Sequence, residues 1–369
     1  MTPEGIELLS ELTIVIPTYN RPLALERSIE YWRDTPVTVH ILDGSERAFF
    51  TVGLQPGTSQ IFYHSFPQIS ETATDNWGRR LKFGTSLIES RFGALCCDDD
   101  VFTVSGLLIA LNYLSDGTVE SVIGKTSEYL LQGKDINWTQ KYSHWKDEKL
   151  QKSDVLSERL MFDSGAHAFY GIFKSGCLKK IHNIGHSYSF PVPVWHSMLV
   201  ITLIKVFCRI KYVDNLLWLK CAVNRPESRP IKFAQLFWDE QFSEYREKFL
   251  NSIGRALQVA EPSLTINETN NIIRSYRTQF TKPKKRRRVE VRLKAQLLLA
   301  ISKLPKYFRE IIFAALPGSI KKRVGNSNFT VNFRPNVLLL ERDLIDDSLQ
   351  NWERILLMPR EELRLRADI

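Results

Sequence analysis

The sequence is poor in the residues that mark several common classes of protein. It has five cysteines among 369 residues, and none of them forms a CxxC pair of the kind that binds zinc. Cys96 and Cys97 are adjacent and cannot form an ordinary disulfide with each other. A reducing compartment, the cytoplasm, is therefore the simplest interpretation.

Glycine-rich phosphate loops and long uncharged apolar runs are missing as well. Neither a GxxxxGK[S/T] loop nor a GxGxxG fingerprint occurs, which excludes the two common phosphate cradles. The most apolar region, residues 192–210, contains His196, Lys205 and Arg209, so we expect a buried helix and no membrane span. We expect no secretory signal, because three glutamates among the first eleven residues stand where such a signal is basic and then apolar.

Positive charge is concentrated in one segment. Residues 281–325 hold 14 Lys and Arg against two Glu, a net charge of +12, whereas the whole chain carries +9. Within it, residues 282–323 combine the run KPKKRRR with Leu, Ile and Phe side chains. We expect this segment to lie on an anionic membrane surface, with a solvated linker as the second interpretation. We do not expect nucleic acid as a partner.

Apolar, β-branched runs alternate with helical patterns through the first 130 residues. Alternation in units of about 30 residues predicts an α/β fold with a doubly wound sheet. The chain is expected to be mostly helical from residue 232 onward. The expected strands are residues 12–19, 37–45, 59–65, 92–97 and 120–129, and the expected helices are residues 20–34, 74–90 and 103–117.

Three of these strands end in polar residues, at positions 18–20, 43–45 and 98–100. Ligands of doubly wound sheets bind outside the carboxyl ends of the strands, so we expect the three tips to share one crevice. The third tip is a run of aspartates. A turn, or a helix cap supplied by Asp100, is one interpretation. The other is a site for Mg²⁺ or Mn²⁺, since a divalent cation relieves the repulsion between close carboxylates.

Three segments together resemble the glycosyltransferase family 2 type of GT-A domain. They are TIVIPTYNRP at residues 13–22, ILDGS at 41–45 and CCDDDVF at 96–102; the last is similar to a DDDF-like motif of bacterial members. The resemblance covers about residues 12–180. It implies a GT-A fold, in which a Rossmann-like, doubly wound mixed sheet binds a nucleotide-diphosphate-sugar donor with the help of Mn²⁺ or Mg²⁺.

The resemblance also implies which residues meet the donor. Pro17, Thr18 and Tyr19 are expected to line the base and ribose, and Asp43 to contact one of them. Lys82 falls about where the family has an arginine, although a solvated helix residue is an equal alternative. The complete set expected at the nucleotide-sugar is Pro17, Thr18, Tyr19, Asn20, Arg21, Asp43, Ser45, Lys82, Asp98 and Asp99.

Within the DXD-like motif, Asp98 and Asp100 are the outer carboxylates and the expected metal ligands. Asp100 is the preferred direct ligand, and Asp98 faces the metal or the ribose. The implied reaction is a direct, inverting displacement at the anomeric carbon. In it, the metal stabilises the departing nucleoside diphosphate.

The expected general base is missing from its usual motif. Family 2 enzymes usually supply it as the Asp of an ED pair, but the corresponding place here reads Trp195-His196. His196 is a candidate base, with a packed core histidine as the more common alternative. Trp195 fits the core slightly better than an acceptor site. Asp163 and His167 are further candidates, so the base and the stereochemical outcome stay open.

The predicted organisation is a GT-A domain over residues 1–225, followed by a helical C-terminal region over residues 226–369. The donor half covers about residues 10–130 and the acceptor half about 131–225. The predicted function is transfer of a sugar to a saccharide or lipid-linked acceptor in bacterial surface polysaccharide synthesis, in the cytoplasm or peripherally on the inner face of the cell membrane. One rival is a non-catalytic GT-A-like scaffold subunit, which the missing ED pair favours. Another is a sugar-nucleotidyltransferase, which the lack of glycine in IPTYNRP disfavours.

Overall fold

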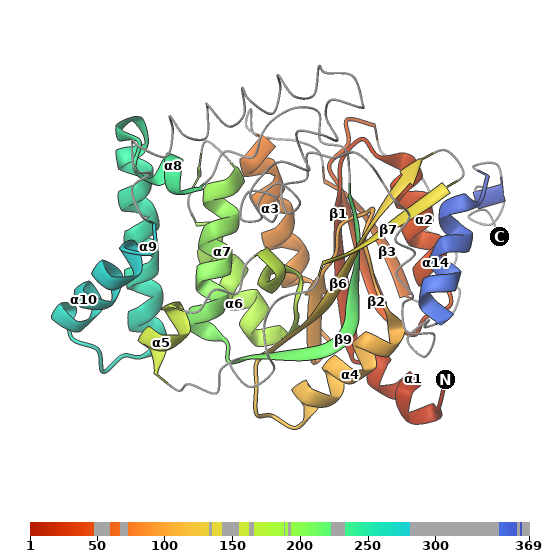
Figure 1. Cartoon of the computed structure of the whole chain (residues 1–369), viewed down its shortest axis with the longest axis horizontal. Helices are drawn as coiled ribbons and strands as arrows, with labels where there is room; N and C mark the ends of the chain where they lie inside the picture. Colours follow the sequence, from red (N-terminus) through yellow and green to blue (C-terminus); the bar gives the residue numbers. More distant parts are fainter. Residues whose placement is uncertain are drawn as a thin grey trace, which may run out of the picture.

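The computed structural model shows a mixed sheet with helices on both of its faces (Figure 1). Helices α3, α6 and α7 lie on one side of the sheet, and α1, α2, α4 and α14 on the other. The structure describes residues 1–47, 60–66, 73–132, 135–141, 155–161, 166–187, 189–190, 193–222, 233–280, 347–359 and 362–363. The basic segment 282–323 and the candidate base Asp163 lie outside these residues.

The described residues form a nine-stranded sheet in the order β3-β2-β1-β4-β8-β6-β9-β5, with β7 paired to β6. The first four strands in this order are parallel, and β8 is antiparallel to both β4 and β6. This confirms the predicted α/β fold, with a mixed sheet covered by helices on both faces. The strands are β1 (Leu12–Thr18), β2 (Thr38–Asp43), β3 (Gln60–Ser65), β4 (Phe92–Leu95), β5 (Val101–Phe102), β6 (Ser121–Gln132), β7 (Asp135–Lys141), β8 (Ile172–Lys174) and β9 (Ile210–Cys221).

Strand β1 shows why this part of the chain must be an interior strand. Its residues are apolar on both faces: Ile14 and Ile16 point into one core, and Val15 points into the other. All three are buried. A β-branched run without polar alternation is typical of a parallel strand that is covered on both sides. The central position of β1 therefore follows directly from its sequence.

The predicted helices are confirmed, with small changes at their ends. Helix α2 begins at Pro22 with Arg21 as its N-cap, so Asn20 does not cap it. Thr103 caps α4 by accepting from the Gly106 N–H, so Asp100 is not used as a cap. The helices are α1 (Pro3–Ser10), α2 (Pro22–Trp32), α3 (Ala73–Ser86), α4 (Val104–Ser115), α5 (Leu156–Met161), α6 (Ser175–Gly185), α7 (Pro193–Phe207), α8 (Phe233–Phe237), α9 (Ser243–Ala260), α10 (Ile266–Arg277) and α14 (Asp347–Leu357), with 3₁₀ turns η2 (Ala166–Tyr170) and η3 (Glu240–Phe242).

Helix α7 is the buried helix that the sequence predicts. Its apolar side chains enter the core shared with α6 and α9, and Lys205 near its end is also buried. Among the described helices, none combines the length and apolar character needed to cross a membrane.

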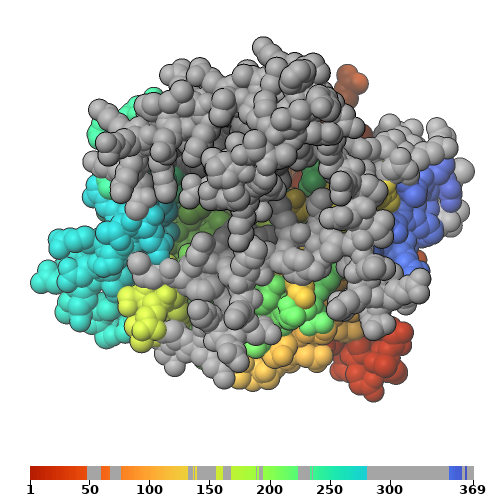
Figure 2. All heavy atoms as spheres, viewed as in Figure 1, coloured from red at the N-terminus to blue at the C-terminus, as the bar shows by residue number. Residues whose placement is uncertain are grey.

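The C-terminal region contacts both ends of the domain. Helices α9 and α10 lie at one end of the molecule, beyond α7, and α14 lies at the other end beside α2 (Figures 1 and 2). Trp352 of α14 packs edge-on against Tyr31 and Tyr129, and Arg27 donates to the Leu356 carbonyl over 2.8 Å. Helix α14, in the predicted C-terminal region of residues 226–369, therefore completes the core beside α2.

Trp352→Ala should destabilise the fold. Trp352 is 1% exposed, and truncating a buried Trp to Ala costs about 3–5 kcal/mol in the free energy of unfolding. Urea denaturation measures the change. The control is Leu357→Ala on the same helix, where the side chain is 49% exposed and the expected change is below about 0.5 kcal/mol. Equal stability of the two variants would contradict the docking of α14.

Candidate functional site

The polar tips of β1, β2 and β4 meet at one edge of the sheet. Thr18 and Asp43 are register partners at the ends of β1 and β2. The Thr18 hydroxyl donates to Asp98 Oδ2 over 2.7 Å, which joins β1 to the turn that follows β4. Because parallel strands end on the same side of a sheet, the three polar tips lie close together, as the sequence predicts.

Arg21 pairs with the first two aspartates of the triplet. Its guanidinium donates to Asp98 Oδ1 over 2.8 Å and to Asp99 Oδ2 over 2.5 Å. Burial raises the pKa of Asp98 to about 6, and the charge of Asp99 adds to the rise, while Arg21 and the Thr18 hydroxyl oppose it. The Arg21 guanidinium neutralises part of the carboxylate cluster, and its side chain stays 43% exposed. Its contact with the donor stays a prediction.

Asp99 and Asp100 are fixed by strands distant in sequence. Asp100 Oδ1 accepts from the Cys221 N–H at the end of β9 over 2.8 Å. The Tyr129 hydroxyl of β6 donates to the Asp99 carbonyl over 2.5 Å. Burial raises the pKa of Asp100 to about 8, with a further contribution from the charge of Asp99. Two carboxylates are thus held close together in a site from which water is largely excluded.

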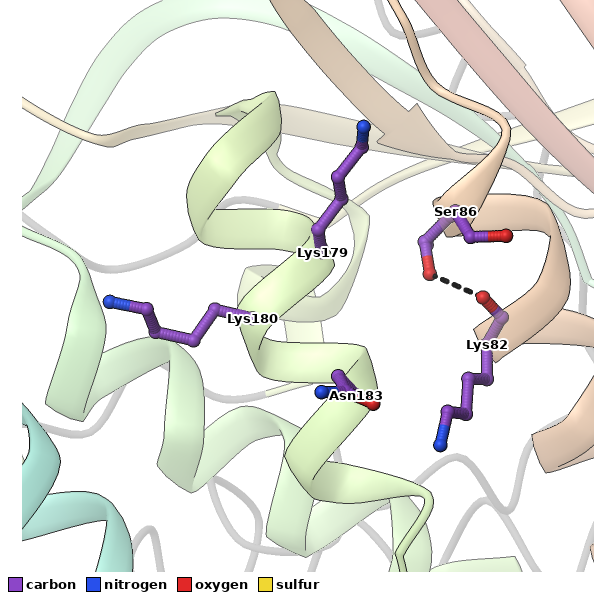
Figure 3. A pocket seen from close by; sticks show the side chains of 6 residues that line it. Lys82, Ser86, Lys179, Lys180 and Asn183 are labelled. Carbon is purple, nitrogen blue, oxygen red and sulfur yellow. Dashed lines mark hydrogen bonds between the residues drawn. The ribbon is translucent and has the colours of Figure 1, made fainter.

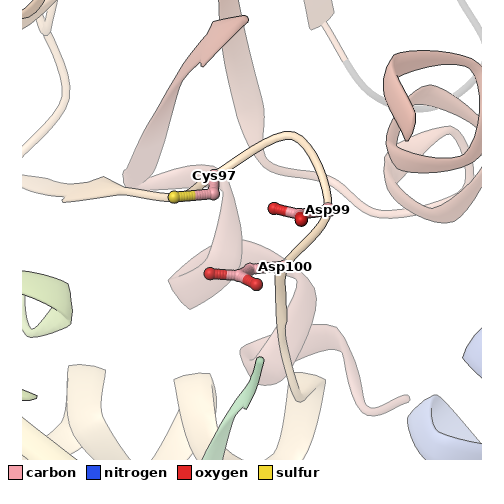
Figure 4. Close-up of side chains that lie close together, drawn as sticks. All are labelled: Cys97, Asp99 and Asp100. Atoms are coloured by element: carbon pink, nitrogen blue, oxygen red, sulfur yellow. The ribbon is translucent and has the colours of Figure 1, made fainter. Parts of the chain in front are cut away.

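One group of described residues has metal-ligand spacing. Cys97 Sγ and carboxylate oxygens of Asp99 and Asp100 all lie within 4.8 Å of one another, on the turn after β4 (Figure 4). Burial raises the pKa of the Cys97 thiol well above its usual value, so the thiol stays protonated and is a poor ligand. The remaining donors are hard carboxylate oxygens, which fit Mg²⁺ or Mn²⁺.

The two carboxylates of this group, Asp99 and Asp100, differ by one residue from the predicted pair, Asp98 and Asp100. Both oxygens of Asp98 are engaged, one by Thr18 and the other by Arg21. Asp99, a predicted donor contact, lies beside Asp100. Asp99 Oδ2 also accepts from Arg21 and Asp100 Oδ1 from the Cys221 N–H, so all three carboxylates have partners. Asp99 and Asp100 are the two whose oxygens lie within 4.8 Å of each other and of Cys97 Sγ, which is the spacing that would hold a cation.

The expected donor residues after β1 and β2 are tied to each other. The Asn20 N–H donates to Ser45 Oγ over 2.8 Å, and Asn20 has a left-handed φ of 53°, which Asn tolerates better than most residues. The Ser45 N–H donates to Asp43 Oδ1 over 2.8 Å, and the Tyr63 hydroxyl donates to Asp43 Oδ2 over 2.5 Å. Pro17 is half-buried in β1. These bonds fix the residues that follow β1 and β2 relative to one another.

Arg80 of α3 is a functional candidate that the sequence analysis missed. Its side chain is buried, its guanidinium lies 5.8 Å from the ring of the partly exposed Tyr19, and a Cβ at Gly44 would overlap it. Burial lowers the pKa of Arg80, although the charges of Asp43 and Asp98 act in the other direction. Nε and Nη1 are buried and have no hydrogen-bond partner. A buried guanidinium with unused donors at the strand tips is arranged to receive an anion.

Lys82 lies elsewhere. It lines a pocket of about 450 Å³ between α3 and α6, and it is two residues beyond Arg80 on the same helix (Figure 3). Two residues correspond to about 200° of rotation around an α-helix, so the two side chains leave α3 on opposite sides. The helical pattern could have identified Arg80, because it lies four residues from both Asn76 and Gly84, which are buried on the same face of α3.

The candidate base His196 belongs to a cluster of three histidines. His182 Nδ1 lies 3.0 Å from His186 Nε2, which lies 3.3 Å from His196 Nε2. The rings of His186 and His196 stack with centroids 3.9 Å apart, and Trp77 of α3 stands edge-on to His196. His196 is 2% exposed. Burial lowers the pKa of His182 to about 3 and that of His186 well below its usual value, so these two are neutral at pH 7.

The structure also describes the side chain of Trp195 and the backbone of His167. Trp195 is fully buried and packs with Phe233, Phe237 and Phe249, which agrees with the core interpretation. Only the backbone of His167, in η2, is described.

No protein-family model and no curated protein matches the sequence. Similar solved structures include those of S. aureus TarS. The TarS complex with UDP has 12% identity and a TM-score of 0.46, over 96% of this chain and 91% of that one. The complex with UDP-GlcNAc has 14% identity and a TM-score of 0.43, over 72% and 71%. Another TarS structure has 11% identity and a TM-score of 0.42, over 94% and 54%. These scores are below 0.5, so the site rests on the geometry described above.

Acidification should weaken the fold through the histidine cluster. The pKa of His182 is about 3 in the folded protein and about 6.5 when unfolded, so its contribution is complete above pH 6.5 and is lost as the pH falls below it. The slope is up to about 1.4 kcal/mol per pH unit for each proton taken up on unfolding. Thermal unfolding of the native chain and His182→Gln between pH 7.5 and 5 measures it.

The stability of His182→Gln should depend less steeply on pH than that of the native chain. Asp98 and Asp100 have raised pKa values and therefore act in the opposite direction, but they do so in both proteins and cancel in the comparison. Parallel profiles would show that the cluster takes up no proton on unfolding.

Proposed function

We propose that this protein is a metal-dependent glycosyltransferase that uses a nucleotide-diphosphate-sugar donor. The observation that carries the proposal is a cluster of carboxylates beside a buried guanidinium at the strand tips. Arg21 pairs with Asp98 and Asp99, and Asp100 has no ion pair among the described residues, while two buried nitrogens of Arg80 have no hydrogen-bond partner. A metal–diphosphate unit would suit both groups, because carboxylates bind the cation and a guanidinium binds phosphate oxygens.

Different residues of the chain would bind different parts of the donor. Arg80 binds the diphosphate, and Gly44 leaves room for its guanidinium. Tyr19, 37% exposed beside Arg80, offers a ring face to the base, and Asp43 borders the ribose. Asp99 and Asp100 would hold Mg²⁺ or Mn²⁺, which, when bound, offsets the negative charge that develops on the departing nucleoside diphosphate.

His196 is the proposed general base. The imidazole of His196 would take the proton of the acceptor hydroxyl. Asp163 and His167 remain alternative candidates. An inverting displacement follows from a base that acts on the acceptor without a covalent intermediate on the enzyme.

We place the reaction in bacterial surface polysaccharide synthesis, on the cytoplasmic side of the membrane, with a saccharide or lipid-linked acceptor. The family resemblance of the segments around residues 13–22, 41–45 and 96–102 supports this assignment. The basic segment 282–323 would hold the protein near an anionic membrane surface.

Turnover with Mn²⁺ tests the proposal. We expect release of nucleoside diphosphate from at least one of a panel of UDP-, GDP- and dTDP-sugars, and we expect Asp100→Asn to reduce it by about 100-fold or more. Asp116→Asn, in the exposed turn after α4, is the control. Donor binding without turnover would favour the scaffold subunit. Pyrophosphate release from a nucleoside triphosphate and a sugar phosphate would favour the nucleotidyltransferase.

Arg80→Gln should weaken nucleoside diphosphate binding by about 10- to 100-fold, since hydrogen bonds to charged groups contribute about 1.5–3 kcal/mol. Titration calorimetry with the diphosphate of the active donor measures the change. Arg79→Gln, at the neighbouring exposed position of α3, is the matched control. The same measurement on Lys82→Gln distinguishes Lys82 from Arg80. A large loss of nucleoside diphosphate affinity in Lys82→Gln, and none in Arg80→Gln, would identify Lys82 as the diphosphate ligand.

A further inference from the structure

Two histidines face each other on neighbouring strands at one edge of the described sheet. His40 lies on β2 and His64 on β3, the strand with which the sheet order begins. His40 is the register partner of Phe62, so His64 lies two residues further along β3 and points to the same face of the sheet. His40 Nδ1 and His64 Nε2 are 2.9 Å apart. Ring nitrogens from two separate strands therefore meet at one place.

The rings of Phe62 and Phe83 hold the two imidazoles in position. Phe62 stacks on His40, with centroids 5.1 Å apart and an angle of 19° between the planes. Phe83 of α3 stands edge-on to His64 at 5.8 Å, and Phe66 packs beside Phe83 at 5.3 Å. Side chains whose orientation is fixed by packing lose little conformational freedom when they bind a ligand. The pair is therefore arranged for binding before a ligand arrives.

Both imidazoles are neutral at pH 7 and only half-buried. Burial lowers the pKa of His40 to about 4, with a further contribution from His64, and burial also lowers the pKa of His64. A neutral imidazole has a nitrogen lone pair, and this is the form that binds metal ions. Protonation of the rings therefore does not compete with a metal ion at neutral pH.

The distance between the two nitrogens indicates which coordination geometry they suit. Bonds between a metal ion and imidazole are about 2.0–2.1 Å long, so two of them at a right angle place their nitrogens about 2.9 Å apart, and two at a tetrahedral angle about 3.3 Å apart. The separation of 2.9 Å fits two adjacent positions of a tetragonal site, which Cu²⁺ and Ni²⁺ prefer. Mg²⁺ prefers oxygen ligands and does not suit this pair.

The same separation fits a hydrogen bond between the rings, in which the donor depends on the tautomers. A cation needs a lone pair on both facing nitrogens. Each neutral ring then carries its proton on its other nitrogen, which is Nε2 in His40 and Nδ1 in His64. Only the ring that donates in the metal-free protein changes its tautomer, so the two rings release no proton when a cation binds at pH 7.

We propose that His40 and His64 bind a divalent transition-metal ion that prefers nitrogen ligands, such as Ni²⁺ or Cu²⁺, with water as the remaining ligands. This site is distinct from the carboxylates after β4, whose oxygens suit Mg²⁺ or Mn²⁺. The ion joins β2 to β3 and so fastens β3 to the sheet. A ligand that binds only the folded chain stabilises it, whether or not the protein transfers a sugar.

Titration calorimetry of the full chain with Ni²⁺ tests the proposal, in an excess of Mg²⁺ that occupies the carboxylates. Ni²⁺ is the probe because it does not oxidise the free cysteines. We expect His40→Gln and His64→Gln each to weaken Ni²⁺ binding by about tenfold or more, since one imidazole alone loses the advantage of two linked ligands. His182→Gln, in the buried cluster on α6, is the control and should bind Ni²⁺ as the native chain does.

NMR spectra of the chain labelled with ¹⁵N-histidine locate the ion, because paramagnetic Ni²⁺ broadens the ring signals nearest to it. We expect the signals of His40 and His64 to broaden first and together. Ni²⁺ should also raise the midpoint of thermal unfolding of the native chain more than that of either single variant.

Three results would overturn the proposal. Equal Ni²⁺ affinity of the native chain and both single variants would show that the pair does not bind the ion. Loss in only one of the two variants would show an ordinary single-histidine contact. Loss in His182→Gln, with none in the other two, would place the ion at the buried histidine cluster. Asp100→Asn should leave Ni²⁺ binding unchanged, so failure of the proposed donor site and failure of this site give different results.

Discussion

Carboxylates that are buried side by side repel one another and lose their hydration. The residues around the turn after β4 offset part of this free-energy cost. Asp98 receives a hydroxyl and a guanidinium, and Asp100 receives a backbone N–H. The raised pKa values of both show that these partners offset the cost only in part. The residual affinity for positive charge is what makes the turn after β4 suited to a cation.

The same constraint explains why the partners come from so many parts of the chain. A carboxylate accepts several hydrogen bonds, and a single neighbouring loop cannot supply them all. The donors come from β1, from the start of α2 and from the end of β9. Tyr129 of β6 fixes the backbone of the same turn. The turn is therefore held in place by hydrogen bonds from other parts of the chain.

The sequence was sufficient to predict the strands and their meeting point, because both depend on local patterns. A β-branched run identifies β1, and parallel strands must end at one edge. It was not sufficient to separate Asp98 from Asp99, since their roles depend on Arg21 reaching across 77 and 78 residues. Arg80 was missed for another reason: the choice between two cations on α3 depends on how that helix is rotated about its axis, and a motif alignment carries no such information.

The docking of α14 on α2 has a consequence for the way the protein is made. Arg27 cannot donate to the Leu356 carbonyl until 329 more residues have been synthesised. At ribosomal rates this interval is on the order of tens of seconds. While α14 is still being synthesised, Tyr31 and Tyr129 lack the indole that covers them in the folded protein. The core beside α2 is therefore completed only after α14 has left the ribosome, so residues near the start of the chain stay partly uncovered until a segment made much later has emerged.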